Sequence, residues 1–395
     1  MEELVRARWV VSAEGSKSAV RHAIGLDFEG EKYIGFRIHI ADVNAKWTLA
    51  TPVGQTFFYV EKHGYMGGQR LPGHPDRFYF YILTKDEHPD DDSNELDIKE
   101  VEWLVRLFSG DGEATLSSPD WLNTARYRHG LAETYKKGRA MLIGDAARSA
   151  PPLYGQGMNY AMHDAWNLAW KLAHVVKGWG PEALLDTYAT ERRKLGAELD
   201  ARIDSTFRFV TEPKPLQATL VGAVMPTLLS IDRFKHSFGQ QFLEMDLTYA
   251  GVGLNETATS LGHLKSGWRA PALWVKRLPD CTLANLLDLF DGMAWTLLVI
   301  APAGEHGKEA LALIDYARSK QGSFPHALRP VLLSQGPQRP AALPFDTVVD
   351  GENRYVREHG LPETGLLLVR PDGYIAWAAK GGSKELDAYL NHWLR

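Results

Sequence analysis

The stretch from Gly138 to Trp170 constrains the fold more than any other part of the chain. Ala140 to Ile143 is a short apolar run, long enough for a buried strand, and Gly144-Asp145 follows it directly. Met158 to Val176 then places apolar residues at helical spacing over a broad face. The stretch therefore predicts a strand, a loop and a helix, with Asp145 at the carboxyl end of the strand.

The loop between the predicted strand and helix has the chemistry of a ligand-binding turn. Pro151-Pro152 excludes a helix and stiffens the backbone, whereas Gly155 and Gly157 let the main chain approach a flat or charged group. The helix that follows begins with free N–H groups and the positive end of its dipole, which suit electron-rich oxygens. A strand–loop–helix unit that only packs is the simpler alternative.

The same stretch resembles the second flavin-binding fingerprint of the FAD-dependent aromatic hydroxylases, the para-hydroxybenzoate and phenol hydroxylase type. That fingerprint reads Gly-Asp-Ala-Ala-His, a spacer, Pro-Pro, Gly-Gly-Gln-Gly-Met-Asn, and then a helix with Asp-Ala-x-Asn-Leu-x-Trp-Lys-Leu. Arg148 replaces the usual His, and Tyr154 replaces the first Gly of the pair. The matching residues, in order, are Asp145, Pro151, Pro152, Gly155, Gln156, Gly157, Met158, Asn159, Asp164, Asn167, Trp170 and Lys171.

The resemblance implies a role for each part of this loop. Asp145 is expected to accept hydrogen bonds from the ribityl chain of FAD, and the backbone from Gly157 to Asn159 to stabilise charge on the flavin pyrimidine edge. Pro151 and Pro152 are expected to form the wall near the reactive ring carbon. The expected cofactor contacts from this stretch are Asp145, Pro151, Pro152, Gly155, Gln156, Gly157, Met158 and Asn159.

A second pattern lies near the start of the chain. The run Trp9 to Ser12 predicts a short strand, Glu14-Gly15 a turn, and Ser16 or Ser18 the start of a helix that contains Arg21. It resembles the fingerprint Asp-Gly-x-x-Ser-x-x-Arg of the same hydroxylases, whose carboxylate lies beside the cofactor pyrophosphate and is tied to NAD(P)H use. Glu14 stands in for that Asp, so Glu14 and Arg21 are further expected cofactor contacts. A capped turn is the alternative.

The glycine turn that holds the ADP half of FAD in this family, Gly-x-Gly-x-x-Gly, does not occur in the chain. Gly251-Val-Gly253 has two glycines without the third. This difference supports an alternative to an active enzyme, namely a truncated, non-catalytic family member that serves as an interaction module or a partner-dependent fragment.

Residues 33–124 are rich in predicted strands. Thr56 to Val60 and Arg77 to Thr84 are β-branched and aromatic runs, Gly64 to Pro72 has the composition of a turn, and Ile98 to Phe108 has helical spacing. In the family this region is a mixed sheet over the flavin that forms part of the substrate cavity. Four aromatic residues are candidates for that inner face, although core packing is the better interpretation for most of them: Phe57, Tyr59, Tyr79 and Tyr81.

The second half of the chain begins with a predicted helix from Pro181 to Arg202. Its Leu-x-x-Tyr-x-x-Glu-Arg segment also occurs in the family, and we interpret it as structural. Two helices are predicted near 213–225 and 227–245, and a linker at Gly267 to Pro271. The alternation of strands and helices beyond it, with Leu283 to Leu289 predicted as helical, resembles the thioredoxin-like C-terminal domain of the phenol hydroxylases, where Arg-Pro-Asp-Gly-Tyr recurs, here from Arg370. There is no Cys-x-x-Cys, which excludes thiol redox chemistry.

Together these patterns predict an α/β fold. Residues 1–32 and 125–212 are expected to form a partial FAD-binding domain of the glutathione-reductase-like Rossmann type, and residues 33–124 a mixed-sheet substrate domain. Residues 213–266 are expected to be a helical connection and residues 267–395 a thioredoxin-like domain.

Composition limits the function further. A net charge of −5 gives no indication of nucleic-acid binding, and the single cysteine, Cys281, excludes an internal disulfide or a cysteine-based metal site. No metal site is predicted. The most apolar run, Leu216 to Leu229, is short and broken by Pro226, so no membrane span is predicted, and the start of the chain lacks a signal-peptide core. A reducing, cytoplasmic compartment fits this composition.

The resemblance therefore implies a monooxygenase that uses FAD, NAD(P)H and O₂ to hydroxylate an aromatic or phenolic small molecule, with a homodimer as the expected assembly. A base that deprotonates a phenol could be a His or a Tyr. Tyr127, His129 and Tyr154 are candidates without a distinguishing signal, so the sequence assigns no catalytic residue.

Overall fold

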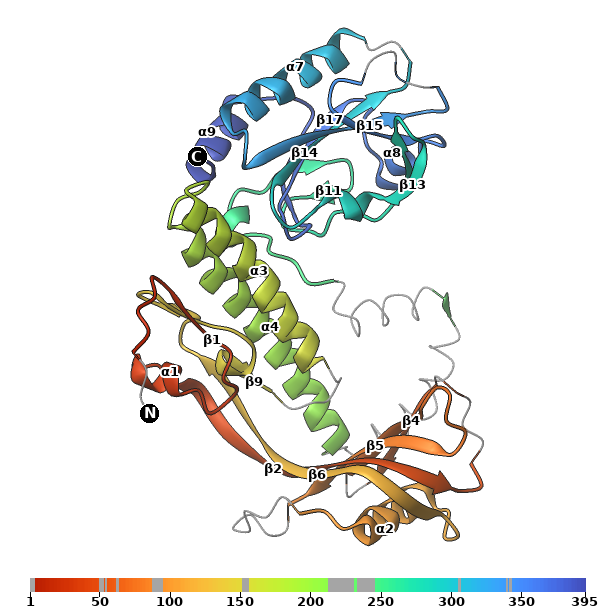
Figure 1. The fold of residues 1–395 in the computed structure, drawn as a ribbon. Helices are drawn as coiled ribbons and strands as arrows, with labels where there is room; N and C mark the ends of the chain where they lie inside the picture. Colours follow the sequence, from red (N-terminus) through yellow and green to blue (C-terminus); the bar gives the residue numbers. More distant parts are fainter. Residues whose placement is uncertain are drawn as a thin grey trace.

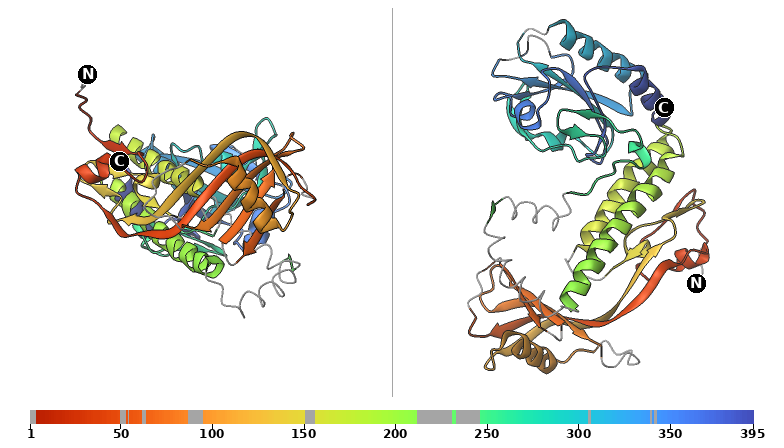
Figure 2. Two further views of the ribbon diagram at one scale, coloured as in Figure 1. Left: turned by 90° about the horizontal axis from the view of Figure 1, so that it is seen from below. Right: turned by 180° about the vertical axis from the view of Figure 1, so that it is seen from behind.

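The computed structural model describes residues 4–49, 53, 55–61, 64–86, 95–150, 156–211, 231–232, 246–304, 307–338, 340 and 343–395. Two long helices, α3 (Gly157–Lys177) and α4 (Leu184–Thr211), lie side by side at the centre of the molecule. A sheet-rich unit lies at one end of this helix pair and the C-terminal unit at the other (Figure 1), and Figure 2 shows the same arrangement from below and from behind.

The strands predicted around the flavin-type motifs form a small three-stranded sheet. β1 (Val10–Ser12) pairs in parallel with β8 (Ala140–Leu142), and β7 (Lys136–Lys137) pairs with β8 from the other side. Helix α1 (Ala19–Ala23) follows β1 and is capped by the side chain of Ser18. Residues from positions 10 and 140 thus become neighbours, which brings the two sequence motifs together.

A six-stranded sheet contains the strand-rich region, in the order β3-β4-β5-β2-β6-β9. β2 (Phe28–Lys46) and β6 (Thr115–Ala132) are long and pair antiparallel from Phe28 opposite Ala132 to Lys46 opposite Thr115. The other strands are β3 (Thr56–Glu61), β4 (Gly64–Arg70), β5 (Arg77–Lys85) and β9 (Arg148–Ser149). Helix α2 (Ile98–Ser109), predicted from its spacing, packs on one face of this sheet, and α3 and α4 lie on the other side (Figure 1).

The prediction of a turn from Gly64 to Pro72 is wrong, because most of this stretch is strand β4. Two of its glycines, Gly67 and Gly68, lie beneath aromatic rings of the neighbouring strands. A Cβ atom at Gly67 would come within 2.2 Å of the Tyr81 ring, and one at Gly68 within 2.6 Å of the Phe57 ring. Glycine is required here for close packing rather than for a turn.

The C-terminal unit contains a seven-stranded sheet in the order β13-β12-β16-β15-β14-β17-β18. Its central strands β14 (Trp295–Pro302), β15 (Leu328–Gln335) and β16 (Asp346–Asp350) are parallel, and β17 (Gly365–Val369) and β18 (Ile375–Ala379) are antiparallel. The helices are α7 (Lys308–Ser323), α8 (Arg354–His359) and α9 (Lys384–Trp393). Both faces of β14 are buried, so its sequence is continuously apolar rather than alternating.

The edge of this sheet corrects another prediction. Leu283 to Leu289 is not one helix: β13 (Thr282–Asn285), which pairs with β12 (Trp274–Leu278), is followed by a single 3₁₀ turn, η3 (Leu286–Leu289). Asn285 caps the start of this turn, because its side chain accepts from the Leu287 amide, so the strand ends where the turn begins.

The stretch predicted as a linker at Gly267 is instead tied to the C-terminal unit. The Gly267 amide donates to the Ile375 carbonyl at 2.7 Å, and Arg269 forms a β-bridge with Tyr374. A Cβ atom at Gly267 would lie 2.4 Å from the Ala250 amide nitrogen, so only glycine allows this close approach.

The part of the connection that the structure describes, residues 246–266, contains the 3₁₀ turn η2 (Gly253–Asn255) and the hairpin β10 (Ser260–Leu261) and β11 (Leu264–Lys265). The helices predicted near 213–225 and 227–245 lie outside the described residues, except for positions 231 and 232. We propose the same four domains that the sequence predicts, namely residues 1–32 with 125–212, residues 33–124, residues 213–266 and residues 267–395. The first two boundaries then fall inside the long strands β2 and β6.

Candidate functional site

The turn after β8 is fixed tightly against α3. Gly144 adopts a φ of 59°, and its amide donates to Oδ2 of Asp164 at 2.9 Å. A Cβ atom at Gly144 would lie 3.0 Å from the Cβ atom of Ala161 on the same helix. The left-handed backbone and the close approach both require glycine, and together they set the position of Asp145 in the 3₁₀ turn η1 (Gly144–Ala146) relative to α3.

Asp145 lies at the carboxyl end of β8, as the sequence predicts. The residue is exposed, and none of the described residues forms a hydrogen bond or an ion pair with its carboxyl group. Surrounding protein atoms nevertheless desolvate that group enough to raise its pKa, and the positive charge of Arg148 offsets part of the rise. Asp145 is therefore available as an acceptor for a ligand at this edge.

The start of α3 is also open. The side chain of Gln156, the N-cap residue, forms no capping bond and instead accepts from Nδ2 of Asn159 at 2.6 Å. Within the described part of the chain, the amides of Gly157, Met158 and Asn159 have no partner. Three free donors at a helix N-terminus fit a ligand with electron-rich oxygens. Pro151, Pro152, Tyr154 and Gly155, which precede this helix, lie outside the described residues.

Glu14 has a local structural task. Its Oε2 atom accepts from the hydroxyls of Ser12 (2.8 Å) and Ser18 (2.7 Å) and from the amide of Val20 (3.0 Å). These bonds, of which the one from Ser18 has the largest effect, lower the pKa of Glu14. The structure thus shows the capped turn; a contact of Glu14 with a cofactor stays a prediction.

Arg21 is buried rather than open to a ligand. Its guanidinium donates to the carbonyl oxygens of Ala146 (3.2 Å) and Ser16 (2.7 Å) and stacks over the Phe28 ring at 3.8 Å. It therefore joins α1 to the turn that carries Asp145. Arg21 holds two parts of the proposed site together, and direct contact with a cofactor stays a prediction.

The inner half of the α3 motif is buried and faces α4. Asp164 pairs with Arg192, and neither side chain has any solvent exposure. Arg192 also donates to the Tyr249 hydroxyl and to the Tyr160 carbonyl, both at 3.2 Å. Asp164 therefore connects the Gly144 turn to α4 and to the loop at Tyr249, which confirms that the Glu-Arg segment of α4 is structural.

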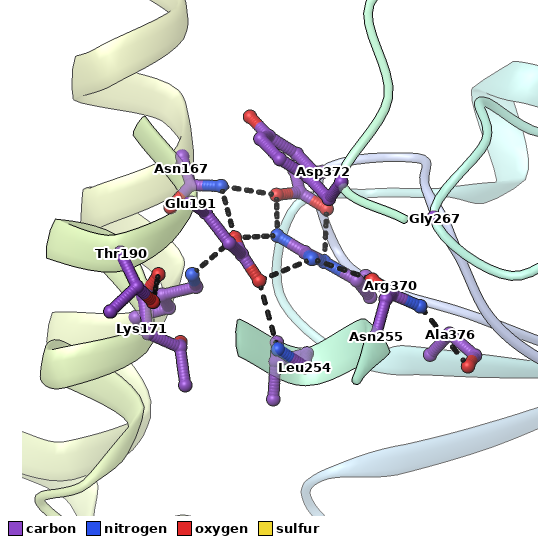
Figure 3. A network of polar contacts seen from close by, with 12 residues as sticks. Asn167, Lys171, Thr190, Glu191, Leu254, Asn255, Gly267, Arg370, Asp372 and Ala376 are labelled. Carbon is purple, nitrogen blue, oxygen red and sulfur yellow. Dashed lines mark hydrogen bonds and ion pairs between the residues drawn. The ribbon is translucent and has the colours of Figure 1, made fainter. Parts of the chain in front are cut away.

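Glu191 is the centre of a second buried network, which joins the helix pair to the C-terminal unit (Figure 3). Its carboxylate accepts from Lys171 Nζ at 2.7 Å and from two Arg370 nitrogens at 2.9 Å each. Arg370 also pairs with Asp372, so two carboxylates and two cations offset each other. The Glu191 and Arg370 partnership spans 179 positions of sequence, and no local pattern indicates it.

The six-stranded sheet turns its aromatic residues to two faces. Phe57 and Tyr59 pack in the cluster around α2, together with Phe78 and Phe80 of β5. Tyr79 and Tyr81 alternate with these phenylalanines, so they face away from α2, toward the side of α3 and α4 (Figure 1). Burial raises the pKa of both phenols, so both stay protonated and can donate hydrogen bonds.

Arg148, the departure from the fingerprint, is buried and pairs with Asp200 of α4; its guanidinium lies 4.8 Å from the centre of the Tyr160 ring. Asp200 also pairs with His129 of β6 at 3.0 Å. His129 therefore has a structural partner, and no catalytic role follows for it. Tyr154 and the side chain of Tyr127 lie outside what the structure describes, so both stay predictions.

Comparison with known proteins agrees with this geometry. The family model described as "FAD binding domain" matches residues 1–202, and the one described as "Aromatic-ring hydroxylase, C-terminal" matches residues 263–395. The chain belongs to the family of FAD-binding aromatic-ring hydroxylases. The family and the fold class predicted from the sequence, including its thioredoxin-like C-terminal part, are thereby confirmed, and FAD is the cofactor of this family.

The pentachlorophenol 4-monooxygenase of Sphingobium chlorophenolicum is 29% identical over 380 residues, which cover 95% of this chain and 66% of that protein. The 6-methylpretetramide 4-monooxygenase of Streptomyces rimosus is 30% identical over 406 residues, which cover 98% and 67%. An anhydrotetracycline hydroxylase from Streptomyces rimosus has a similar solved structure, with a TM-score of 0.69, 24% identity and coverage of 98% and 68%. The chain thus spans about two thirds of the length of the curated relatives it matches.

None of the helices in the part of the chain that the structure describes combines the length and the apolar character that crossing a bilayer requires.

Proposed function

We propose that this chain carries the flavin and substrate contacts of an FAD-dependent monooxygenase that hydroxylates an aromatic or phenolic small molecule. The observation that carries the proposal is that the Asp145 carboxylate and the amides at the start of α3 have no partner among the described residues, in a chain of this family. Asp164 of α3 accepts from the Gly144 amide and so holds the turn of Asp145 against this helix. A carboxylate acceptor beside free backbone donors suits a ligand that has both hydroxyl groups and electron-rich ring oxygens.

In this proposal Asp145 accepts hydrogen bonds from the ribityl hydroxyls, and the amides of Gly157, Met158 and Asn159 donate to the pyrimidine edge. Bound FAD, reduced by NAD(P)H, supplies the oxygen chemistry with O₂. The loop roles that the sequence implies for Pro151, Pro152 and Gly155 are part of this proposal. So are the places of Glu14 and Arg21 beside the cofactor. Gln156 orders the helix start.

The substrate class follows from the sheet face that carries Tyr79 and Tyr81. These protonated phenols present O–H donors within an aromatic surface, since Tyr81 packs against Tyr65 and Phe58 with ring centres 6.1 and 6.0 Å apart. An aromatic body with an oxygen acceptor matches such a face. A homodimer and a cytoplasmic location, expected from the sequence, belong to the same proposal.

The alternative of a truncated, non-catalytic member draws no support from the comparisons, because the curated relatives named above are monooxygenases. Titration of the purified chain with FAD, followed by flavin fluorescence quenching, tests the proposal. We expect a saturable one-to-one complex, and then oxidation of NADH or NADPH that a phenolic substrate stimulates. An absence of both FAD binding and stimulated oxidation would refute the proposal.

A further inference from the structure

A cavity of about 380 Å³ lies between the middle of α3 and the C-terminal unit. Met162, His163 and Trp166 line it from the helix, and Tyr249, Arg269 and Tyr374 line it from the opposite side. Asn167 and Asp372 complete the lining. The cavity is one helical turn beyond Asn159, and the contacts proposed for flavin use none of its eight residues. Its volume is in the range of ordinary small-molecule sites.

The cavity contains the positive charge of Arg269. Arg269 donates from Nε to the Tyr374 hydroxyl at 3.1 Å and contacts Nδ1 of His163 through Nη2 at 3.2 Å. No carboxylate of the described residues forms an ion pair with Arg269. Asp372, also in the wall, is already paired with Arg370. A guanidinium held in this way is ready to bind an anion.

His163 adds a second donor. Burial, and after it the charges of Arg269 and Arg192, lowers the pKa of His163 to about 4, so the ring is neutral near pH 7. Because Nδ1 faces the Arg269 donor, that atom is the acceptor and the ring proton belongs on Nε2. The cavity thus presents hydrogen-bond donors and a cation on its polar side.

The remaining walls are apolar and aromatic. Met162 and Trp166 are each 53% exposed, although both are large hydrophobic residues. Tyr249 and Tyr374 lie opposite them as a ring pair with centres 4.4 Å apart. A flat hydrocarbon body would cover Met162 and Trp166 and remove their apolar surface from water.

We propose that this cavity binds a small aromatic carboxylate. The carboxylate would accept from the Arg269 guanidinium and from Nε2–H of His163, and the ring would lie against Trp166 and Met162. This site is separate from the proposed flavin site, and it does not depend on monooxygenase activity.

Isothermal titration calorimetry on the full chain without FAD tests the proposal. The probes are 2-naphthoate, which has both ring and charge, 2-naphthalenemethanol, which has no charge, and acetate, which has no ring. We expect saturable one-to-one binding of 2-naphthoate and at least about tenfold weaker binding of the other two, since each lacks one recognised group. Absence of 2-naphthoate binding, or equal binding of acetate, would overturn the proposal.

Two variants locate the bound acid. Arg269→Gln keeps a planar polar side chain but removes the charge, so 2-naphthoate should bind about ten- to a hundredfold more weakly. Arg277→Gln is the matched control, because Arg277 is an arginine of the same unit that pairs with Asp346 at the surface. If Arg269→Gln does not fold, Trp166→Ala removes the aromatic wall at a half-exposed position and should weaken binding about tenfold. Unchanged affinity in the variant that folds would refute the site.

Discussion

Replacement of Glu191 by Gln tests how the helix pair is joined to the C-terminal unit. The carboxylate has no solvent exposure, and each of its oxygens accepts from several donors. Oε1 accepts from Arg370 and from the Leu254 amide at 3.1 Å, and Oε2 from Lys171, Arg370 and the Asn167 side chain. A Gln side chain has nearly the same shape, so the substitution changes charge and hydrogen bonding with little change in volume.

The magnitude follows from these contacts. Whichever way the amide is oriented, its NH₂ group faces at least two donors that lose their acceptor. The cluster of Glu191, Asp372, Arg370 and Lys171, in which two carboxylates offset two cations, acquires an uncompensated positive charge in a buried place. Breaking a buried ion pair from one side costs about 3–5 kcal/mol. For a chain of 395 residues the unfolding entropy is about 0.8 kcal/mol/K, so this loss should lower Tm by about 4–6 °C.

Thermal unfolding followed by near-ultraviolet circular dichroism measures this effect, because the network lies beside Trp170 and Trp295. Glu198→Gln is the matched control, because it is the same substitution on the same helix. The Glu198 side chain is 41% exposed, and its Oε1 atom forms a long surface ion pair with Lys194 Nζ at 3.6 Å. A surface pair of this kind contributes about 0–1 kcal/mol, so Tm should change little. If Glu191→Gln changed Tm no more than the control does, the reasoning about this network would be wrong.

Three further predictions concern acid stability, the glycine turn and the flavin contact. Burial alone would raise the pKa of Glu191, but Arg370 and Lys171 outweigh it and lower that pKa to about 2 from 4.5. The wild type should therefore lose stability as the pH falls from about 4.5 to about 2, and Glu191→Gln should show a shallower loss in acid melts. Gly144→Ala should destabilise the protein more than Gly178→Ala in urea titrations. Both glycines have positive φ, so each alanine costs about 1–2 kcal/mol, but of the two only an alanine at Gly144 would also meet a neighbour, the Cβ atom of Ala161 at 3.0 Å. Equal losses of stability would exclude a cost from that contact. Asp145→Asn should weaken FAD binding about ten- to a hundredfold and leave the Tm of the chain without FAD unchanged. The surface variant Asp186→Asn should bind FAD as the wild type does. Unchanged affinity for Asp145→Asn would exclude the ribityl role.

The sequence predicted those parts whose pattern is local. An apolar run predicts the strand at Ala140, and helical spacing predicts the helix from Gly157 and helix α2. Each pattern lies within about 20 residues. The Gly144-Asp145 turn was predictable for the same reason, because a glycine and a carboxylate directly follow a buried strand.

The predictions failed where tertiary contacts decide the local structure. Gly67 and Gly68 are typical of a turn by composition, yet the rings of Tyr81 and Phe57 make them part of a strand. Gly267 has the composition of a linker, but its close approach to Ala250 is visible only in three dimensions. The partnership of Glu191 with Arg370 likewise depends on which side chains meet after folding.

The buried contacts of α3 affect how the flavin-binding fingerprint should be used to compare proteins. Asp164, Asn167 and Lys171 bind neighbouring parts of the protein, so selection for folding alone would preserve them. Among the described residues of the pattern, the outer half, Asp145 and the amides at the helix start, is the part that we propose for the cofactor. A descendant that abandoned flavin would diverge first at that outer half while its inner half stayed recognisable. A survey that counts the whole pattern would therefore not separate a retained fold from a retained flavin site, and the outer positions are the ones to score.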